Sequence, residues 1–300
     1  MLYRILCSVD TWMITRVVRR PIDPHKVDKL GSTPRPATIS PRQMKVALVC
    51  IAKNEDNYID EWLDYHLKLG FTKIFLHQND WRYHGKHIGN DRVQLIEYDG
   101  IHKQVPAYNG FMHKHCNNYD WAGFMDIDEF VVLKQHSNIL DFLFEYNDYY
   151  AVGLNWSVFG SNGRTFDGEY SLIKRFTKCR KRFIDEIKCF VNFNLAKDTL
   201  QFTWNPHNVE GIDKTIAVDK SHYINGPWNR EHGDARNIAY INHYYTKTRE
   251  EFRQKMDRGW PLPMPDPKGV EEQYYNERNT PEFNEYEDLT AYNFMYGDTK

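Results

Sequence analysis

A short, unbroken apolar run, KVALVCIA at residues 45–52, opens the main folding region of the chain. A run of this length without polar alternation is typical of a strand buried on both faces. Directly after it, Ile59, Trp62 and Leu63 are spaced as one stripe of a helix, and Gly70 stands where a helix commonly ends. A buried strand followed at once by an amphipathic helix predicts an α/β fold with parallel strands.

The rest of the chain continues this alternation and then changes character. Further strands are predicted at 73–78, 92–98 and 121–128, with helices at 106–119 and in SNILDFLFEY, capped by Ser137 or Asn138. Later come five predicted strands, mostly antiparallel, and one helix: AVGLNWSVFG, YSLIKRF, IKCFVNFNLA, KTIAVDKSHYI, IAYINHYY and the helix TKTREEFRQKMDRG. We therefore expect a mixed, largely parallel central sheet flanked by helices, with an antiparallel C-terminal portion.

Composition divides the chain into three parts. Residues 1–44 read as an N-terminal helix and a Pro-rich linker, 45–267 as the main domain, and 268–300 as an acidic, aromatic tail with one short helix near 281–292. The helix at the start is interrupted by charges and lacks the pattern of a signal peptide, so we expect it to dock on the protein or to touch a membrane surface.

Charge and cysteine content narrow the class of protein. The net charge of −2 does not suggest a partner such as nucleic acid. Five cysteines, with no CxxC spacing, favour a reducing compartment over a disulfide framework or a cysteine zinc site. No apolar run approaches the roughly 18 residues of a membrane span. We expect a cytoplasmic protein, with peripheral membrane contact through the N-terminal helix as a further expectation.

The segment FMDIDEF, residues 124–130, places three carboxylates inside an otherwise apolar stretch. If the strand continues through it, Asp126 and Asp128 point to the same face. A hard divalent cation such as Mg²⁺ or Mn²⁺ would remove their mutual repulsion. In the alternative, the strand ends at Asp126 and the charged residues lie in a solvated turn. The Asp-x-Asp tripeptide alone favours the alternative, because it is common by chance.

Four segments in a fixed order strengthen the first interpretation. They are CIAKNEDNYIDEWLDYHLKLGFTKIFLHQND, WAGFMDIDEF, NWSVFGSNG and INHYYTKTREEFRQKMDRG. Together they resemble glycosyltransferase family 92 and its family-2-like bacterial and viral relatives, over about residues 45–260. The resemblance implies a GT-A, Rossmann-like fold and a bound nucleotide-sugar. The charged stretch between Ser161 and Lys188 does not align with the family, which leaves the acceptor side undefined.

The same resemblance assigns residues to the nucleotide. The loop after the first strand would lie beside the base and ribose, although Asn54 and Glu55 are equally suited to capping the next helix. Trp156 would stack on a sugar, but a core position is the favoured alternative. Lys188 would reach a phosphate. The full set of expected nucleotide-binding residues is Ala52, Lys53, Asn54, Glu55, Asp126, Ile127, Asp128, Trp156 and Lys188.

The resemblance also implies a metal cofactor, Mn²⁺ or Mg²⁺. Asp128 is the expected direct ligand, and Asp126 is expected to contact the ribose or a metal-bound water. His243, in INHYYTKT, would complete the set, with His207 as its rival; a lone histidine is more often a satisfied polar residue.

The implied reaction moves a hexose, galactose or glucose, from a UDP-sugar to a hydroxyl of a glycan or lipid-linked glycan, with inversion. Inversion needs one general base on the acceptor side. Glu210 is preferred, with Asp213, Asp167 and Glu169 as alternatives, and each of these alone is more often a surface charge. A nucleotidyltransferase or a metal-dependent phosphohydrolase is the first rival, and the former is disfavoured because CIAKNED has no glycine. A catalytically inactive GT-A-like module that binds a glycan or nucleotide remains the second.

Overall fold

The computed structural model describes residues 40–196, 205–207, 209, 215–259 and 270–297. These residues belong to one unit, Ser40–Lys300. The predicted N-terminal helix and most of the predicted linker fall in residues 1–39, which lie outside the described residues. The elements in chain order are η1 (Pro41–Gln43), β1 (Val46–Ala52), α1 (Ile59–Lys68), β2 (Lys73–Gln78), β3 (Val93–Glu97), α2 (Gln104–His115), β4 (Trp121–Phe124), β5 (Glu129–Leu133), α3 (Ile139–Phe144), β6 (Ala151–Val158), α4 (Leu172–Arg175), β7 (Lys178–Cys179), β8 (Ile187–Asn192), β9 (Thr215–Ala217), β10 (Tyr223–Ile224), α5 (Ala235–Ile238), β11 (Ala239–His243), α6 (Arg249–Asp257), α7 (Glu271–Glu277), η2 (Pro281–Asn284), β12 (Tyr286–Glu287) and α8 (Thr290–Tyr296).

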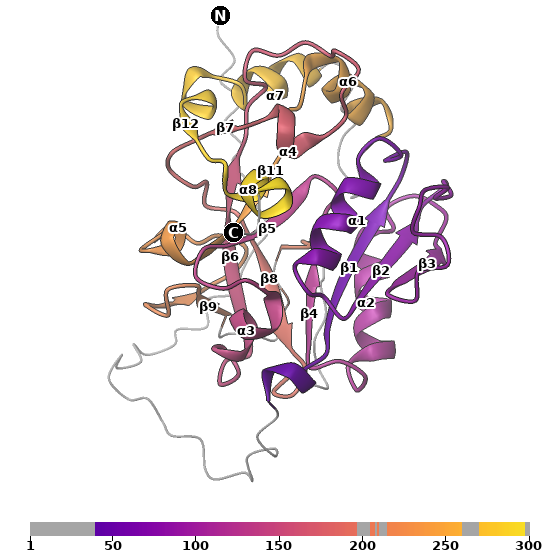
Figure 1. Ribbon diagram of the computed structural model, residues 1–300, viewed down its shortest axis with the longest axis vertical. Coiled ribbons are helices and arrows are strands. Elements are labelled where there is room, and N and C mark those ends of the chain that lie inside the picture. Colours follow the sequence, from indigo (N-terminus) through magenta and orange to yellow (C-terminus); the bar gives the residue numbers. More distant parts are fainter. Residues whose placement is uncertain (1–39, 197–204, 208, 210–214, 260–269, 298–300) are drawn as a thin grey trace, which may run out of the picture. The chain divides into compact units, whose positions relative to one another are not determined.

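One large mixed sheet organises the described residues (Figure 1). Its strand order is β10-β9-β6-β8-β4-β1-β2-β3, and β11 joins it at β6 and carries β5. The half formed by β4, β1, β2 and β3 is parallel, while β8 runs antiparallel between β4 and β6. The predicted α/β fold with a largely parallel sheet, flanking helices and an antiparallel portion is confirmed.

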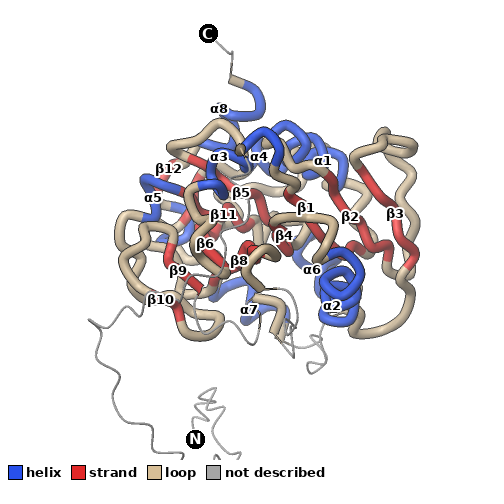
Figure 2. The backbone as a smooth tube through the Cα atoms, turned by 90° about the horizontal axis from the view of Figure 1, so that it is seen from below, coloured by secondary structure: helices blue, strands red, loops and turns tan. Residues whose placement is uncertain are grey.

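Helices cover the two faces of the parallel half, as the alternation of β1 shows (Figure 2). Val46, Leu48 and Cys50 belong to the apolar cluster that includes the buried face of α1. Ala47 and Val49 belong to the cluster that includes the buried face of α2. Because successive residues of a strand point to opposite faces, β1 must be apolar throughout, as its unbroken run predicted.

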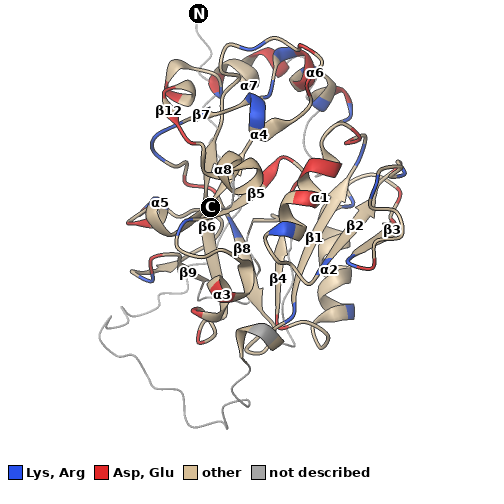
Figure 3. Ribbon diagram, in the orientation of Figure 1, with Lys and Arg blue, Asp and Glu red and all other residues tan. Residues whose placement is uncertain are grey.

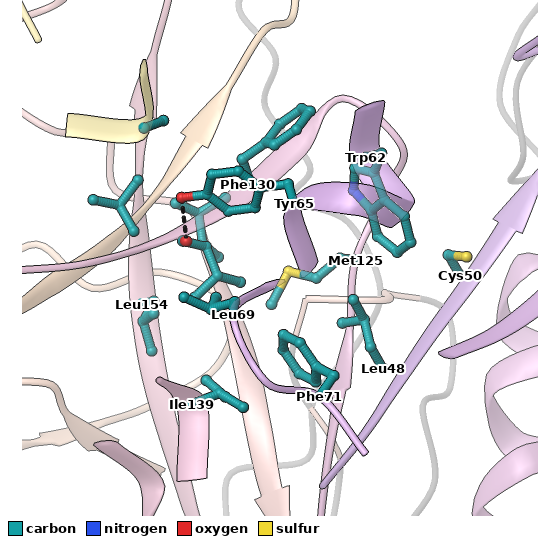
Figure 4. Packing of buried hydrophobic residues seen from close by; sticks show 14 of the residues in the cluster. Leu48, Cys50, Trp62, Tyr65, Leu69, Phe71, Met125, Phe130, Ile139 and Leu154 are labelled. Carbon is teal, nitrogen blue, oxygen red and sulfur yellow. Dashed lines mark hydrogen bonds between the residues drawn. The ribbon is translucent and has the colours of Figure 1, made fainter. Parts of the chain in front are cut away.

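Helix α1 fixes the segment between β4 and β5 through two of its aromatic side chains. Trp62 Nε1 donates to the carbonyl of Glu129 at 2.8 Å, and the Tyr65 hydroxyl donates to the carbonyl of Val131 at 2.9 Å. Figure 4 shows Trp62 and Tyr65 near Phe130 in the surrounding core, and the Tyr65 and Phe130 ring centroids are 5.2 Å apart. The start of β5 is thereby tied to a helix that follows β1.

Several predicted elements differ from the structure. The strand expected at 121–128 ends at Phe124, and a new strand begins at Glu129, so the Asp-x-Asp residues lie in a turn between β4 and β5. The segment YSLIKRF forms the short helix α4 rather than a strand. Ser171 accepts the amide of Lys174 there, and Glu61 accepts the amide of Leu172, so side chains satisfy the first helical donors.

The C-terminal residues 270–297 pack on the same body. The amide of Gly160 donates to the carbonyl of Phe283 at 2.9 Å, and the Tyr240 hydroxyl donates to Asp288 at 2.6 Å. An added Cβ at Gly160 would collide with Asn284, so the glycine after Phe159 allows a close approach of the C-terminal segment. In place of one helix near 281–292, the chain forms η2, β12 and α8.

The described surface carries both signs of charge. Basic and acidic segments are interspersed along the ribbon in Figure 3. Within the described residues, no helix combines the length and the apolar character that crossing a bilayer requires.

Candidate active site

A cavity of about 500 Å³ opens where β1 and β4 end. Its wall is built from the loop after β1, the loop between β3 and α2, the β4–β5 turn and the last turn of α6. Most of the residues predicted to bind nucleotide or metal line it: Ala52, Lys53, Glu55, Asp126, Ile127, Asp128, Trp156, His207 and His243. Parallel strands present their carboxyl ends at one edge of a sheet, which explains why segments distant in sequence meet there.

Asp126 is held from two sides. Its carboxylate accepts a hydrogen bond from Gln104 Nε2 at 2.6 Å and from Lys188 Nζ at 3.1 Å, and its side chain is 34% exposed toward the cavity. Burial by itself raises the pKa of Asp126, but the Lys188 ammonium outweighs this effect and holds the pKa below its usual value. Lys188 is fully buried and is not part of the cavity wall, so it lies behind Asp126 instead of reaching a phosphate directly.

The buried side chain of Glu129 closes the turn by a hydrogen bond to its backbone. Its Oε2 accepts the amide of Asp126 at 2.9 Å and lies 3.5 Å from Lys188 Nζ. Burial raises the pKa of Glu129 well above its usual value, and Lys188 offsets this only in part. The turn is therefore neither a strand nor solvated. Asp128 and Glu129 are buried, Asp126 is partly exposed toward the cavity, and all three have polar partners, because backbone and lysine donors replace the water that they lose.

Two lysines and a histidine surround Asp128. Lys255 Nζ lies 2.6 Å and Lys247 Nζ 3.6 Å from its Oδ2, and His243 Nε2 lies 3.6 Å from its Oδ1. The Asp128 side chain is only 5% exposed, which raises its pKa, yet these neighbours hold the pKa well below its usual value. Lys247 adopts a left-handed backbone (φ +53°) at the turn between β11 and α6.

An ion pair between Arg258 and Glu55 joins the end of α6 to the loop after β1. Arg258 also donates to the carbonyl of Lys53 at 3.1 Å. The predicted capping role of this loop is wrong, because α1 begins after Tyr58 and has no side-chain cap. Asn54 has φ +53° and is absent from the cavity wall, so its backbone turns the chain and Glu55 faces Arg258.

The cavity offers few side chains that could bind a divalent cation. Among the residues that the structure describes, no group of three His, Cys, Asp or Glu side chains is placed to hold a metal. Asp128 Oδ1 and His243 Nε2 do form a pair facing the cavity. Asp126 is committed to Gln104 and Lys188, and His207 Nδ1 faces the carbonyl of Ile187 at 2.9 Å. Two protein ligands suit Mg²⁺ or Mn²⁺ when phosphate and water supply the rest.

Trp156 stands between the two candidate histidines. Its ring centroid lies 4.8 Å from that of His207 and 4.3 Å from that of His243. Its Nε1 is buried with no hydrogen-bond partner, although the residue lines the cavity. Phe159 is fully buried and belongs to the core. Trp156 is thus placed to contact a ligand, whereas Phe159 is not.

Among the residues of this wall that sequence reasoning missed are Gln104, Lys255 and Arg258. Two other basic residues of this region are placed differently: Arg253 is 59% exposed and pairs with Glu271, whereas Lys247 is buried. The available signal was the spacing of Lys255 and Arg258, three residues apart on one helical face.

None of the four carboxylates predicted as the general base is seen in the wall of the cavity among the described residues. Glu210 and Asp213 lie outside the described residues. Asp167 and Glu169 do not line the cavity, and they pair with Arg164 and Lys174 at the surface. His207, three residues before Glu210 in the chain, does line it.

Comparison with known proteins identifies a family whose members are similar to this chain. The model of glycosyltransferase family 92 matches residues 47–261. A glycosyltransferase family 92 protein of Oryza sativa subsp. japonica is 24% identical over 225 residues, which cover 69% of this chain and 34% of that protein. One from Ricinus communis is 23% identical over 223 residues, 68% of this chain and 36% of its own length. The chain therefore spans about a third of the length of these curated relatives.

Proposed function

We propose, from the premise that this chain belongs to glycosyltransferase family 92, that it moves a hexose from a UDP-sugar to a hydroxyl of a glycan acceptor. The expected sugars are galactose and glucose. The observation that carries the proposal is the cavity in which the Asp126–Asp128 turn faces the basic end of α6. The carboxylates of the turn can bind a divalent metal ion together with phosphate oxygens. The basic side chains of α6 on the opposite wall can pair with the same phosphates, so the cavity suits a nucleoside diphosphate.

The donor would lie with its diphosphate near Asp128, Lys255 and Arg258. Asp128 and His243 are the residues that would hold Mn²⁺ or Mg²⁺. When bound there, such an ion neutralises charge that develops on the departing diphosphate. Asp126, oriented by Gln104 and Lys188, would accept hydrogen bonds from ribose hydroxyls.

Transfer with inversion is a single displacement. The acceptor oxygen forms a bond to the anomeric carbon, the bond from that carbon to the diphosphate oxygen breaks, and its electron pair leaves with UDP. The acceptor proton passes to a general base, for which Glu210 remains our proposal and Asp213 its alternative. Trp156 offers an apolar face beside which the hexose ring can lie.

A thermal-shift screen of nucleotide sugars, with and without Mn²⁺, tests the proposal. A ligand that binds the native state raises the melting temperature by mass action. We expect one UDP-hexose to stabilise the protein when Mn²⁺ is present, and that donor should then yield UDP on incubation with an acceptor glycan. If no nucleotide sugar shifts the protein, the proposal fails. Binding without transfer or hydrolysis would favour an inactive binding module.

A further inference from the structure

One of the two carboxylate oxygens of Asp128, the residue proposed to hold the metal, is already paired with a lysine. Lys255 Nζ donates to Asp128 Oδ2 at 2.6 Å, a close, charge-assisted contact. His243 lies on the other carboxylate oxygen. A divalent ion bound at Asp128 would therefore sit beside a positive charge, and that repulsion is large where water is excluded.

The two lysines at Asp128 differ in their freedom to move. Lys247 is 2% exposed, and its ammonium lies 4.6 Å from the centre of the Tyr58 ring, so its position is enclosed. Lys255 is 15% exposed and lines the cavity from the last turn of α6. Its other contacts are weaker: the carbonyl of Tyr245 at 3.4 Å and the ring of the same residue. Lys255 can swing into the cavity, whereas Lys247 cannot.

We propose that Lys255 exchanges partners, pairing with Asp128 when no nucleotide is bound and with the diphosphate of the donor when Asp128 holds a metal. The inference rests on the proposed function and adds to it that the binding of the metal depends on the binding of the nucleotide. The diphosphate brings the negative charge that lets Lys255 leave Asp128. Metal and nucleotide should therefore each strengthen the binding of the other by the same factor, with Lys255 supplying part of that coupling.

The test measures binding rather than turnover. Mn²⁺ affinity is determined by electron paramagnetic resonance, without nucleotide, for the native protein, Lys255→Met, Lys255→Arg and Arg253→Met. UDP affinity is then determined by calorimetry at saturating Mn²⁺. Arg253→Met is the matched control, because it removes one charge from the exposed face of the same helix. Melting temperatures establish that each variant is folded.

Lys255→Met is expected to bind Mn²⁺ alone more tightly, by roughly tenfold, and UDP more weakly by a similar factor. Lys255→Arg keeps the charge and should stay near the native values, as should Arg253→Met. Equal Mn²⁺ affinity in Lys255→Met and the native protein would overturn the proposal, as would a variant that weakens both ligands. Failure of the proposed function has a different signature, since then UDP does not bind the native protein even with Mn²⁺.

Discussion

Replacing Glu251 by glutamine is expected to lower the free energy of unfolding by about 3 kcal/mol. Glu251 and Arg175 are 3% and 2% exposed, and Arg175 donates to both carboxylate oxygens, at 2.6 and 2.9 Å. Removing one charge of a buried pair leaves the other uncompensated, which costs roughly 3–5 kcal/mol. Glutamine keeps the volume and can still accept from Thr248, so the lower end of that range is expected.

The pKa of Glu251 gives a similar magnitude for the contribution of this carboxylate to the free energy of unfolding. Burial raises this pKa, but Arg175, Thr248 and Tyr58 together lower it from 4.5 to about 2. A difference of that size corresponds to about 3 kcal/mol. Because the folded-state pKa is depressed, the stabilisation is complete above about pH 4.5. It is lost as the pH falls toward 2, where the carboxylate protonates in both states.

Urea denaturation followed by circular dichroism, at pH 7 and at steps down to pH 3, measures both effects. The native protein should lose stability across the acid range, and Glu251→Gln should lose less there because the titrating group is gone. Glu271→Gln is the control, since its pair with Arg253 is exposed and should contribute less than about 1 kcal/mol. If the two variants were equally stable at pH 7, the reasoning from burial would be refuted.

Three further substitutions test the site and its support. Asp128→Asn should abolish Mn²⁺-dependent UDP binding in calorimetry, and it should also lower stability because the buried Lys247 loses its carboxylate; unchanged UDP affinity would contradict the proposed site. Lys188→Met leaves the partly exposed Asp126 and the buried Glu129 without their shared donor and should lower the free energy of unfolding in urea denaturation by about 1–3 kcal/mol, whereas an unchanged value would contradict that pairing. Gly123→Ala places a methyl group against the buried ring of Phe190 and should cost about 1–3 kcal/mol, so an unchanged melting temperature would show that the ring can move freely.

Much of the architecture follows from local pattern. The apolar run before Ala52 became β1, and the helical stripe after it became α1, which ends at Lys68, two residues before Gly70 with φ +100°. The predicted helix TKTREEFRQKMDRG became α6, and Thr248 and Glu251 form a capping box at its start. These elements were predictable because their determinants, periodicity and capping, lie within a few residues of one another.

The site itself was predictable only in part. The family motifs named Asp126, Asp128 and His243, and the structure brings all three into the cavity wall. The strand assumed for Asp126 and Asp128 was wrong. Tyrosine and tryptophan donors from α1 hold the start of β5, and the chain turns between β4 and β5. Such long-range contacts leave no periodic signal in the turn itself.

The sequence by itself determined most of the alternation of strands and helices, the family, and which acidic residues lie at the centre of the site. Tertiary structure alone decided that these residues lie in a turn and how the negative charges of the turn are stabilised. Its charges are balanced by Lys188 from β8, and by Lys247 and Lys255 from the region of α6, more than a hundred residues away for the last two. Pairing of buried charges depends on distance in space and on the exclusion of water, and neither quantity is written in the spacing of residues along a chain.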